Sequence, residues 1–211
     1  MHDSQLQNDD WPPAGCPPLD WPELPDAAAR LAWYRAVIAA YGELWAGHAT
    51  APRVQPVTET ALAELEARLD CRLPADLRQW HSELGVLALA EVLCSVAPDG
   101  TTPIEPLLDA FPAIADLCDD APELLALAGE LVAFGDYLGN GNLFCFHRTS
   151  GEVYYFDHDD GALLTPMFPA VADYLDALMI RTLAEIHEDD VRGEALLAER
   201  IGPALVRKWL Y

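Results

Sequence analysis

The sequence predicts an α+β protein in which an antiparallel β-meander packs against helices. Apolar residues recur at helical spacing in the first third of the chain, and again after residue 169. Between them, residues 131–165 alternate short apolar or aromatic runs with glycine-containing turns, which is typical of antiparallel strands. A chain in which helices are followed by antiparallel strands and then by a helix has the order of an α+β fold. With 52 % hydrophobic residues, the bulk of the chain is not intrinsically disordered.

The chain begins with a proline-rich stretch, residues 1–25, which is expected to form an extended arm. Its prolines forbid a helix and remove the backbone donors that a strand needs. The arm is expected to be either mobile or held on the body through Trp11 and Trp21. Asp26 is a good cap residue, so the first helix is predicted from there to about Gly47. Its apolar stripe consists of Leu31, Tyr34, Ile38, Tyr41 and Trp45.

Two further helices are predicted after a linker at residues 51–56. Thr58 caps the first, which runs to Asp70 and has one apolar face, formed by Leu62, Leu65 and Leu69. Pro74 suits the first turn of the second, and Gly85 is well placed to end it. Its buried side is expected to carry Leu77, Trp80 or His81, and Leu84.

The middle of the chain is less regular before the meander begins. The run of residues 86–96 is short and aliphatic, which favours a strand without excluding a helix. Residues 98–130 are expected to be helical or irregular between prolines. The strands of the meander are then predicted at residues 131–134, 143–147, 152–157 and 162–165.

Helices are predicted again after the meander. Pro169 opens a long amphipathic helix through Val171, Tyr174, Leu178 and Ile186. A helical tail over 191–211, interrupted at Gly202-Pro203, closes the chain. These expectations divide it into an arm (1–25), a first helix with its linker (26–56), an α+β domain (57–180) and a helical tail (181–211).

The net charge limits the classes of partner. Thirty-five acidic residues against 12 basic ones give a formal charge of −23, and Lys208 is the only lysine. Such a field repels nucleic acid and anionic bilayers, because binding to polyanions depends on Lys and Arg. It attracts a basic protein, although the acids could also serve solubility alone. Residues 111–180 hold 12 acids and one base, Arg148.

The cysteines and the apolar runs indicate a reducing, intracellular setting. The five cysteines are odd in number and widely spaced without a CxxC pair, which fits neither a disulfide framework nor a zinc ribbon, so five free thiols are expected. No run is long enough to span a membrane, and the first residues lack the pattern of a secretion signal. The expected location is the cytoplasm.

Three pieces of the chain resemble the SUKH superfamily over about residues 57–180. Residues 69–78, following a helix, look like that family's Leu-Pro and second helix. Residues 134–146 are similar to its strand, Gly-Asp turn and aromatic strand, and residues 151–158 to its Gly-x-Val-Tyr strand and Asp-His turn. The chain departs from the pattern at Leu84-Gly85 and in its proline-rich insertion at 98–130. The resemblance implies an α+β domain that is commonly used in bacteria as an immunity protein against polymorphic toxins.

Several motifs suggest chemistry, and each has a stronger structural interpretation. Residues 157–160 (Asp-His-Asp-Asp) suggest a metal site for hydrolysis, yet all their ligands would come from one turn. Residues 187–190 lack the spacing of a helical zinc motif, and the glycines of 135–141 precede a strand where a phosphate loop requires a helix. Cys145 and His147 match no catalytic signature. No catalytic residue, metal or cofactor is therefore predicted.

The leading functional hypothesis is a non-catalytic binding module: a cytoplasmic immunity protein that neutralises a basic toxin, such as a nuclease, through an acidic face. The alternatives are a regulatory or scaffolding protein of the same fold with an endogenous protein partner, and a metal-dependent hydrolase using residues 157–160. The partner is expected to be a protein, with no nucleic acid and no membrane, and the oligomeric state stays open. The predicted contact residues are Asp136, Tyr137, Glu152, Tyr154, Tyr155, Asp157, Asp159 and Asp160.

Overall fold

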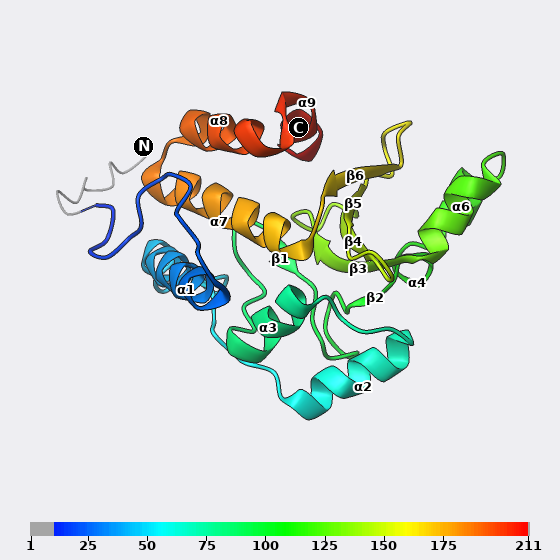
Figure 1. Ribbon diagram of the computed structural model, residues 1–211, viewed down its shortest axis with the longest axis horizontal. Helices are drawn as coiled ribbons and strands as arrows, with labels where there is room; N and C mark the ends of the chain where they lie inside the picture. The colour runs from blue at the N-terminus through cyan, green and yellow to red at the C-terminus, as the bar shows by residue number, and fades with distance from the viewer. Residues whose placement is uncertain (1–10, 211) are drawn as a thin grey trace.

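A computed structural model describes residues 11–210 and shows the predicted α+β architecture (Figure 1). Within this range, six strands form one antiparallel sheet in the order β1-β3-β4-β5-β6, with β2 also paired to β3. The strands are β1 (Val92–Leu93), β2 (Glu105–Pro106), β3 (Leu131–Asp136), β4 (Leu143–His147), β5 (Val153–Phe156) and β6 (Leu164–Phe168). The meander predicted from the glycine-punctuated aromatic runs is therefore present as β3 to β6.

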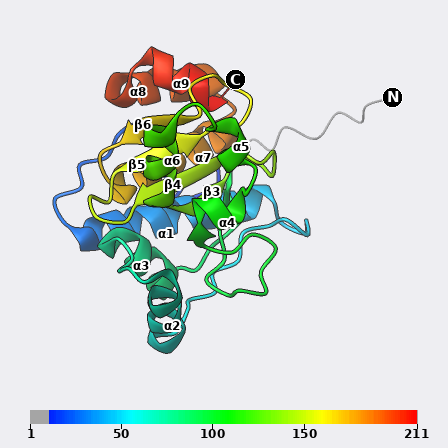
Figure 2. The same cartoon turned by 90° about the vertical axis from the view of Figure 1, so that its right-hand side faces the viewer.

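Helices lie on both faces of the sheet (Figure 2). In the described part of the chain their side chains contribute to two buried clusters, one on each face. The larger cluster receives side chains from α1 (Ala27–Leu44), α2 (Glu59–Leu69), α3 (Ala75–Glu83), α7 (Val171–His187), α8 (Asp190–Ile201) and α9 (Pro203–Leu210). The smaller cluster receives them from α4 (Leu107–Ala110), α5 (Ile114–Leu117) and α6 (Pro122–Gly129).

The side-chain alternation of the strands explains this two-sided core. Neighbouring residues of a strand point to opposite faces. Phe134 and Phe144 thus join the larger cluster, while Cys145 and Phe156 join the smaller one. Because both faces of β3 and β4 are buried, these strands read as nearly continuous apolar runs in the sequence.

The predicted helix caps are confirmed. The Asp26 carboxylate accepts from the Ala29 backbone N–H at 2.8 Å, and the Thr58 hydroxyl accepts from Ala61 at 3.3 Å. Gly85 follows α3 with a φ of +62°, and a Cβ there would lie 1.9 Å from the carbonyl oxygen of Gln55. Only glycine fits at that position.

The described part of the arm lies on α7 and α8. The Trp11 indole donates to the carbonyl of Ile186 at 2.7 Å, and the Trp21 indole donates to that of Leu196 at 3.0 Å. The Arg200 guanidinium sits 3.9 Å from the centre of the Trp21 ring. From residue 11 onward the arm is therefore held on the body of the protein, which is the second of the two alternatives. Residues 1–10 lie outside the described part.

Two details of the prediction were wrong. The aliphatic stretch 86–96 forms a strand only at β1, because its backbone folds back on itself: Leu93 N–H donates to Leu87 at 2.7 Å and Leu89 N–H to Glu91 at 2.9 Å. Its apolar residues are buried without extended pairing. The start of the long helix was also misplaced, since α7 begins at Val171 and β6 occupies residues 164–168. The five cysteines are free, as expected.

Candidate partner-binding site

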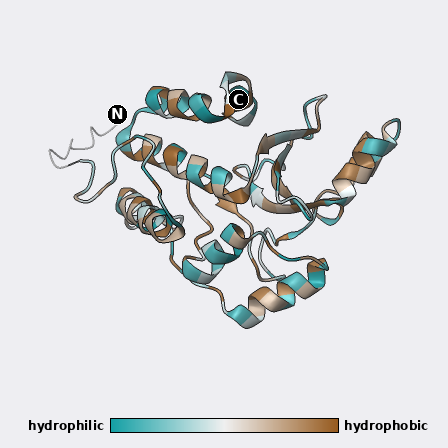
Figure 3. Cartoon of the chain, viewed as in Figure 1, coloured by the Kyte–Doolittle hydropathy of each residue, from teal (hydrophilic) through white to brown (hydrophobic). Residues whose placement is uncertain are grey.

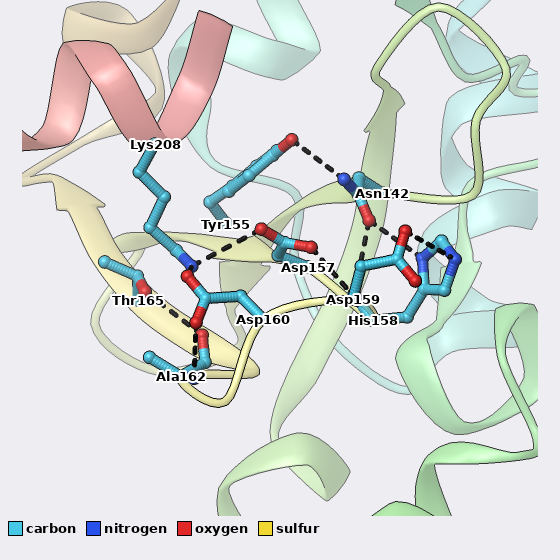
Figure 4. A network of polar contacts seen from close by, with 9 residues as sticks. All are labelled: Asn142, Tyr155, Asp157, His158, Asp159, Asp160, Ala162, Thr165 and Lys208. Carbon is cyan, nitrogen blue, oxygen red and sulfur yellow. Dashed lines mark hydrogen bonds and ion pairs between the residues drawn. The ribbon is translucent and has the colours of Figure 1, made fainter. Parts of the chain in front are cut away.

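Two turns of the meander meet at one edge of the sheet. β3 and β5 run in the same direction, so the β3–β4 and β5–β6 turns emerge at the same end. Asn142 joins them: its Oδ1 accepts from the His158 backbone N–H at 3.2 Å and lies 2.8 Å from Nδ1 of that ring. Its amide also donates to the Tyr155 hydroxyl at 3.2 Å (Figure 4). We call residues 136–142 and 157–163 the turn edge.

The eight predicted contact residues do not form a single surface. Glu152 precedes β5 at its opposite end, about 16 Å along the strand from the turn edge, and accepts from the Tyr154 hydroxyl at 3.0 Å. Tyr155 is 1 % exposed and packs in the larger cluster, so its ring has no surface to offer a partner. The five residues that the structure brings together on the turn edge are Asp136, Tyr137, Asp157, Asp159 and Asp160.

The carboxylates of the turn edge mainly shape the turns themselves. Asp157 accepts from the Asp159 N–H at 3.1 Å, Asp160 from Ala162 at 3.1 Å, and Asp136 from Gly139 at 3.0 Å. Such side chain to backbone bonds replace the missing ladder bonds of a turn. Within residues 11–210, no group of three or more His, Cys, Asp or Glu side chains is placed to hold a metal ion.

Lys208 places its ammonium group beside the β5–β6 turn. Its Nζ lies 2.7 Å from Asp160 Oδ2 and 3.5 Å from Asp157 Oδ2, so α9 covers the turn with the only lysine of the chain (Figure 4). The hydrogen bond from Lys208 holds the pKa of Asp160 below its usual range. Asp159 stays exposed, with His158 Nε2 3.5 Å away. The negative charge of the turn edge is thus partly balanced from within the chain.

Tyr137 is half-buried and already has partners inside the protein. Its hydroxyl donates to the Leu210 carbonyl at 3.2 Å, and the Arg181 guanidinium lies 5.3 Å from the centre of its ring. The tyrosine ties the β3–β4 turn to α9 and α7. A partner at the turn edge could reach only its remaining exposed surface.

A buried carboxylate behind the turn edge was missed by the sequence reasoning. Glu91 has no exposed surface, and its Oε1 accepts from both Arg181 and the Trp209 indole. Its Oε2 accepts from the Tyr174 hydroxyl at 3.0 Å. Burial raises the pKa of Glu91 to about 7, against the opposing effect of the Arg181 charge. The one signal was a lone acid within the aliphatic stretch 86–96.

The remaining sequence motifs have structural partners. His187 Nε2 lies 2.9 Å from the Pro17 carbonyl oxygen and 3.7 Å from Cys16 Sγ, and Asp189 caps α8 through the Arg192 N–H at 2.9 Å. Complete burial raises the pKa of the Cys145 thiol well above its usual value, which disfavours the reactive thiolate. These contacts support the structural interpretation of each motif.

The metal interpretation of residues 157–160 can be tested by melting. If this segment is only a turn, EDTA should leave the melting temperature unchanged, and zinc or manganese should not raise it. An ion that binds only the folded state at 100 times its dissociation constant would add about 2.7 kcal/mol, a shift of several degrees. A shift of that size, lost in Asp157→Ala, would revive the hydrolase hypothesis.

Comparison with known protein families gives a match to this chain. The family described as SMI1 / KNR4 family (SUKH-1) matches residues 56–177, which is more than half of the 211 residues. None of the curated proteins matches the chain. Across the described helices, none combines the length and apolar character that a membrane span requires.

Proposed function

The chain belongs to the SMI1/KNR4 family (SUKH-1), and from this premise we propose that it is a non-catalytic binding module, an immunity protein that neutralises a cognate toxin in the bacterial cytoplasm. The family supports an immunity or regulatory role through protein binding. The choice of a toxin as the partner rests on the charge of this particular chain.

The observation that carries the proposal is the one-sided charge of residues 111–180, with 12 acids and one base. That base, Arg148, donates to the Leu69 carbonyl at 2.8 Å, so its guanidinium is directed to the body of the protein. A surface of one sign attracts a partner of the other. A nuclease fits this description, because an enzyme that acts on a polyanion presents a basic surface.

The test first establishes whether the gene of this chain lies beside a toxin gene, and the absence of such a gene favours the regulatory or scaffolding alternative. Binding kinetics are then measured against the catalytic domain of that toxin. Raising the salt from 50 to 500 mM shortens the Debye length from roughly 14 to 4 Å, so the association rate should fall at least about tenfold. Dissociation should change less, since charges at the rim act mainly on association. The turn-edge contribution is measured by replacing Asp157, Asp159 and Asp160 together with Asn.

Two outcomes would contradict parts of the proposal. If the toxin domain does not bind, the immunity role fails and the regulatory or scaffolding alternative, with an endogenous partner, takes its place. If it binds at a rate indifferent to salt, the acidic excess serves solubility and not recognition.

A further inference from the structure

The α4–α6 segment, residues 107–129, forms a projection on the second face of the sheet. Leu107, Ile114 and Ala128 are fully buried and anchor it to the smaller core cluster. Figure 1 shows α6 reaching away from α1, α7 and α8, and Figure 2 shows the segment in front of the sheet. It lies within the proline-rich insertion that departs from the family pattern.

The α4–α6 segment carries several apolar side chains that are exposed or half-buried. Leu108 and Leu117 are 38 % and 48 % exposed, and they are two of the five exposed large hydrophobic side chains within residues 11–210. Leu124 and Leu127 are half-buried and line a shallow depression of about 600 Å³ together with Asp120 and Glu123. The apolar colouring of α6 is visible in Figure 3. Exposed apolar groups gathered on one element commonly mark a contact surface.

The α4–α6 segment and the residues that flank it in the sequence are rich in acidic side chains. Residues 98–130 contain eight acids and no Lys, Arg or His. In the described chain none of the eight takes part in an ion pair, whereas Asp157 and Asp160 of the turn edge are paired with Lys208. The eight are Asp99, Glu105, Asp109, Asp116, Asp119, Asp120, Glu123 and Glu130. Ion pairs within the protein therefore balance less of the negative charge here than at the turn edge.

We infer that the α4–α6 segment is the surface on which the partner docks, and that the partner offers an apolar centre surrounded by Lys and Arg. An apolar core with a charged, solvent-accessible rim is the usual anatomy of such an interface. A second copy of this chain is a poor occupant, because each copy carries a formal charge of −23 and the two would repel. The inference rests on the proposed function and assigns its binding surface.

The experiment uses the full chain, the neighbouring toxin domain and two sets of substitutions on the α4–α6 segment. The charge set is Asp116→Asn, Asp119→Asn, Asp120→Asn and Glu123→Gln, all at exposed positions. It should slow association by about tenfold at low salt. The apolar set, Leu108→Ser with Leu117→Ser, should raise Kd at least about tenfold, mainly through faster dissociation.

Matched controls separate the local surface from the total charge. Replacing Glu43, Glu64, Glu188 and Glu199 with Gln removes the same four charges from exposed sites elsewhere, taking the net charge from −23 to −19 in both sets. Val191→Ser, at an 81 % exposed site on α8, is the control for the apolar set. Unchanged melting temperatures in all variants would show that each one folds.

The outcomes distinguish the inference from the function on which it rests. Larger effects of both α4–α6 sets than of their controls support the inference. Binding that responds equally to test and control sets, or only to the turn-edge substitutions, overturns the docking surface and leaves the immunity role standing. A toxin domain that does not bind the unaltered chain removes both.

Discussion

Replacing Trp209 with alanine is expected to lower the free energy of unfolding by about 3–5 kcal/mol, the usual cost of removing a buried aromatic ring. Trp209 has no exposed surface, although it lies near the end of the chain. Its ring centre is 5.6 Å from that of Phe144, 5.7 Å from Phe168 and 6.2 Å from Tyr174. Its indole also donates to the buried Glu91 carboxylate. The substitution therefore leaves both a cavity and a carboxylate with one partner fewer.

Thermal and urea unfolding measure this effect directly. For a chain of this length the expected loss corresponds to a fall in Tm of about 10 °C. Trp209→Phe is the matched control, because a phenyl ring fills much of the space of the indole although it lacks the N–H donor, so it should cost less than half as much. A Tm unchanged in Trp209→Ala would mean that α9 does not take part in the cooperative unfolding of the core.

The stability of Trp209→Ala tests whether the C-terminal helices fold together with the α+β domain. The family match ends at residue 177, whereas Val206 and Trp209 pack in the same buried cluster as strands β3 to β5. We propose that the helices beyond the match belong to the same folding unit as the α+β domain. Loss of stability on truncation of a single ring in α9 is the outcome that this proposal requires.

The elements predicted correctly are those in which a cap or turn residue lies directly beside the hydrophobic pattern of the buried face. Asp26 and Thr58 are cap residues directly before amphipathic helices, and the turns of the meander carry glycines where the backbone reverses. In each case one short stretch contains both the stop or start signal and the hydrophobic period. No long-range contact is needed to interpret such a stretch.

What the sequence could not predict depends on contacts between distant segments. Glu91 is buried because Arg181 and Trp209, about 90 or more residues away in the chain, reach its carboxylate. Lys208 is likewise 48 residues from Asp160. The separation of Glu152 from the turn edge, by contrast, follows from strand order alone, since alternate turns of a meander lie at opposite ends.

Replacing Arg181 with methionine should give a loss of stability that depends on pH. In the native protein Arg181 is the cation beside the buried Glu91, and Met preserves much of its aliphatic stem without the charge. Removing one partner of a buried ion pair typically costs about 3–5 kcal/mol, because the other charge is left uncompensated. At pH 9, where Glu91 is ionised in the unaltered protein, we expect a loss of that size.

The loss should shrink at low pH, and the sign follows from the raised pKa of Glu91. A carboxyl whose folded pKa is about 7, against an ordinary value near 4.5, is protonated in the folded state at pH 5 and needs no cation there. Its contribution to stability is fully present below pH 4.5 and is lost as the pH rises through 7. Without Arg181 the folded pKa rises further, so the two proteins should differ little at pH 5 and increasingly above pH 7.

Urea midpoints at pH 5, 7 and 9 test this dependence, with Glu91→Gln/Arg181→Met as the control. That double variant lacks the Glu91 carboxyl. Its free energy of unfolding should therefore not show the additional fall above pH 7 that is expected of Arg181→Met. Arg181 also lies 5.3 Å from the centre of the Tyr137 ring and 5.6 Å from that of Trp209. If the single variant is destabilised equally at pH 5 and pH 9, these ring contacts, and not the charge of Glu91, are what Arg181 contributes to stability.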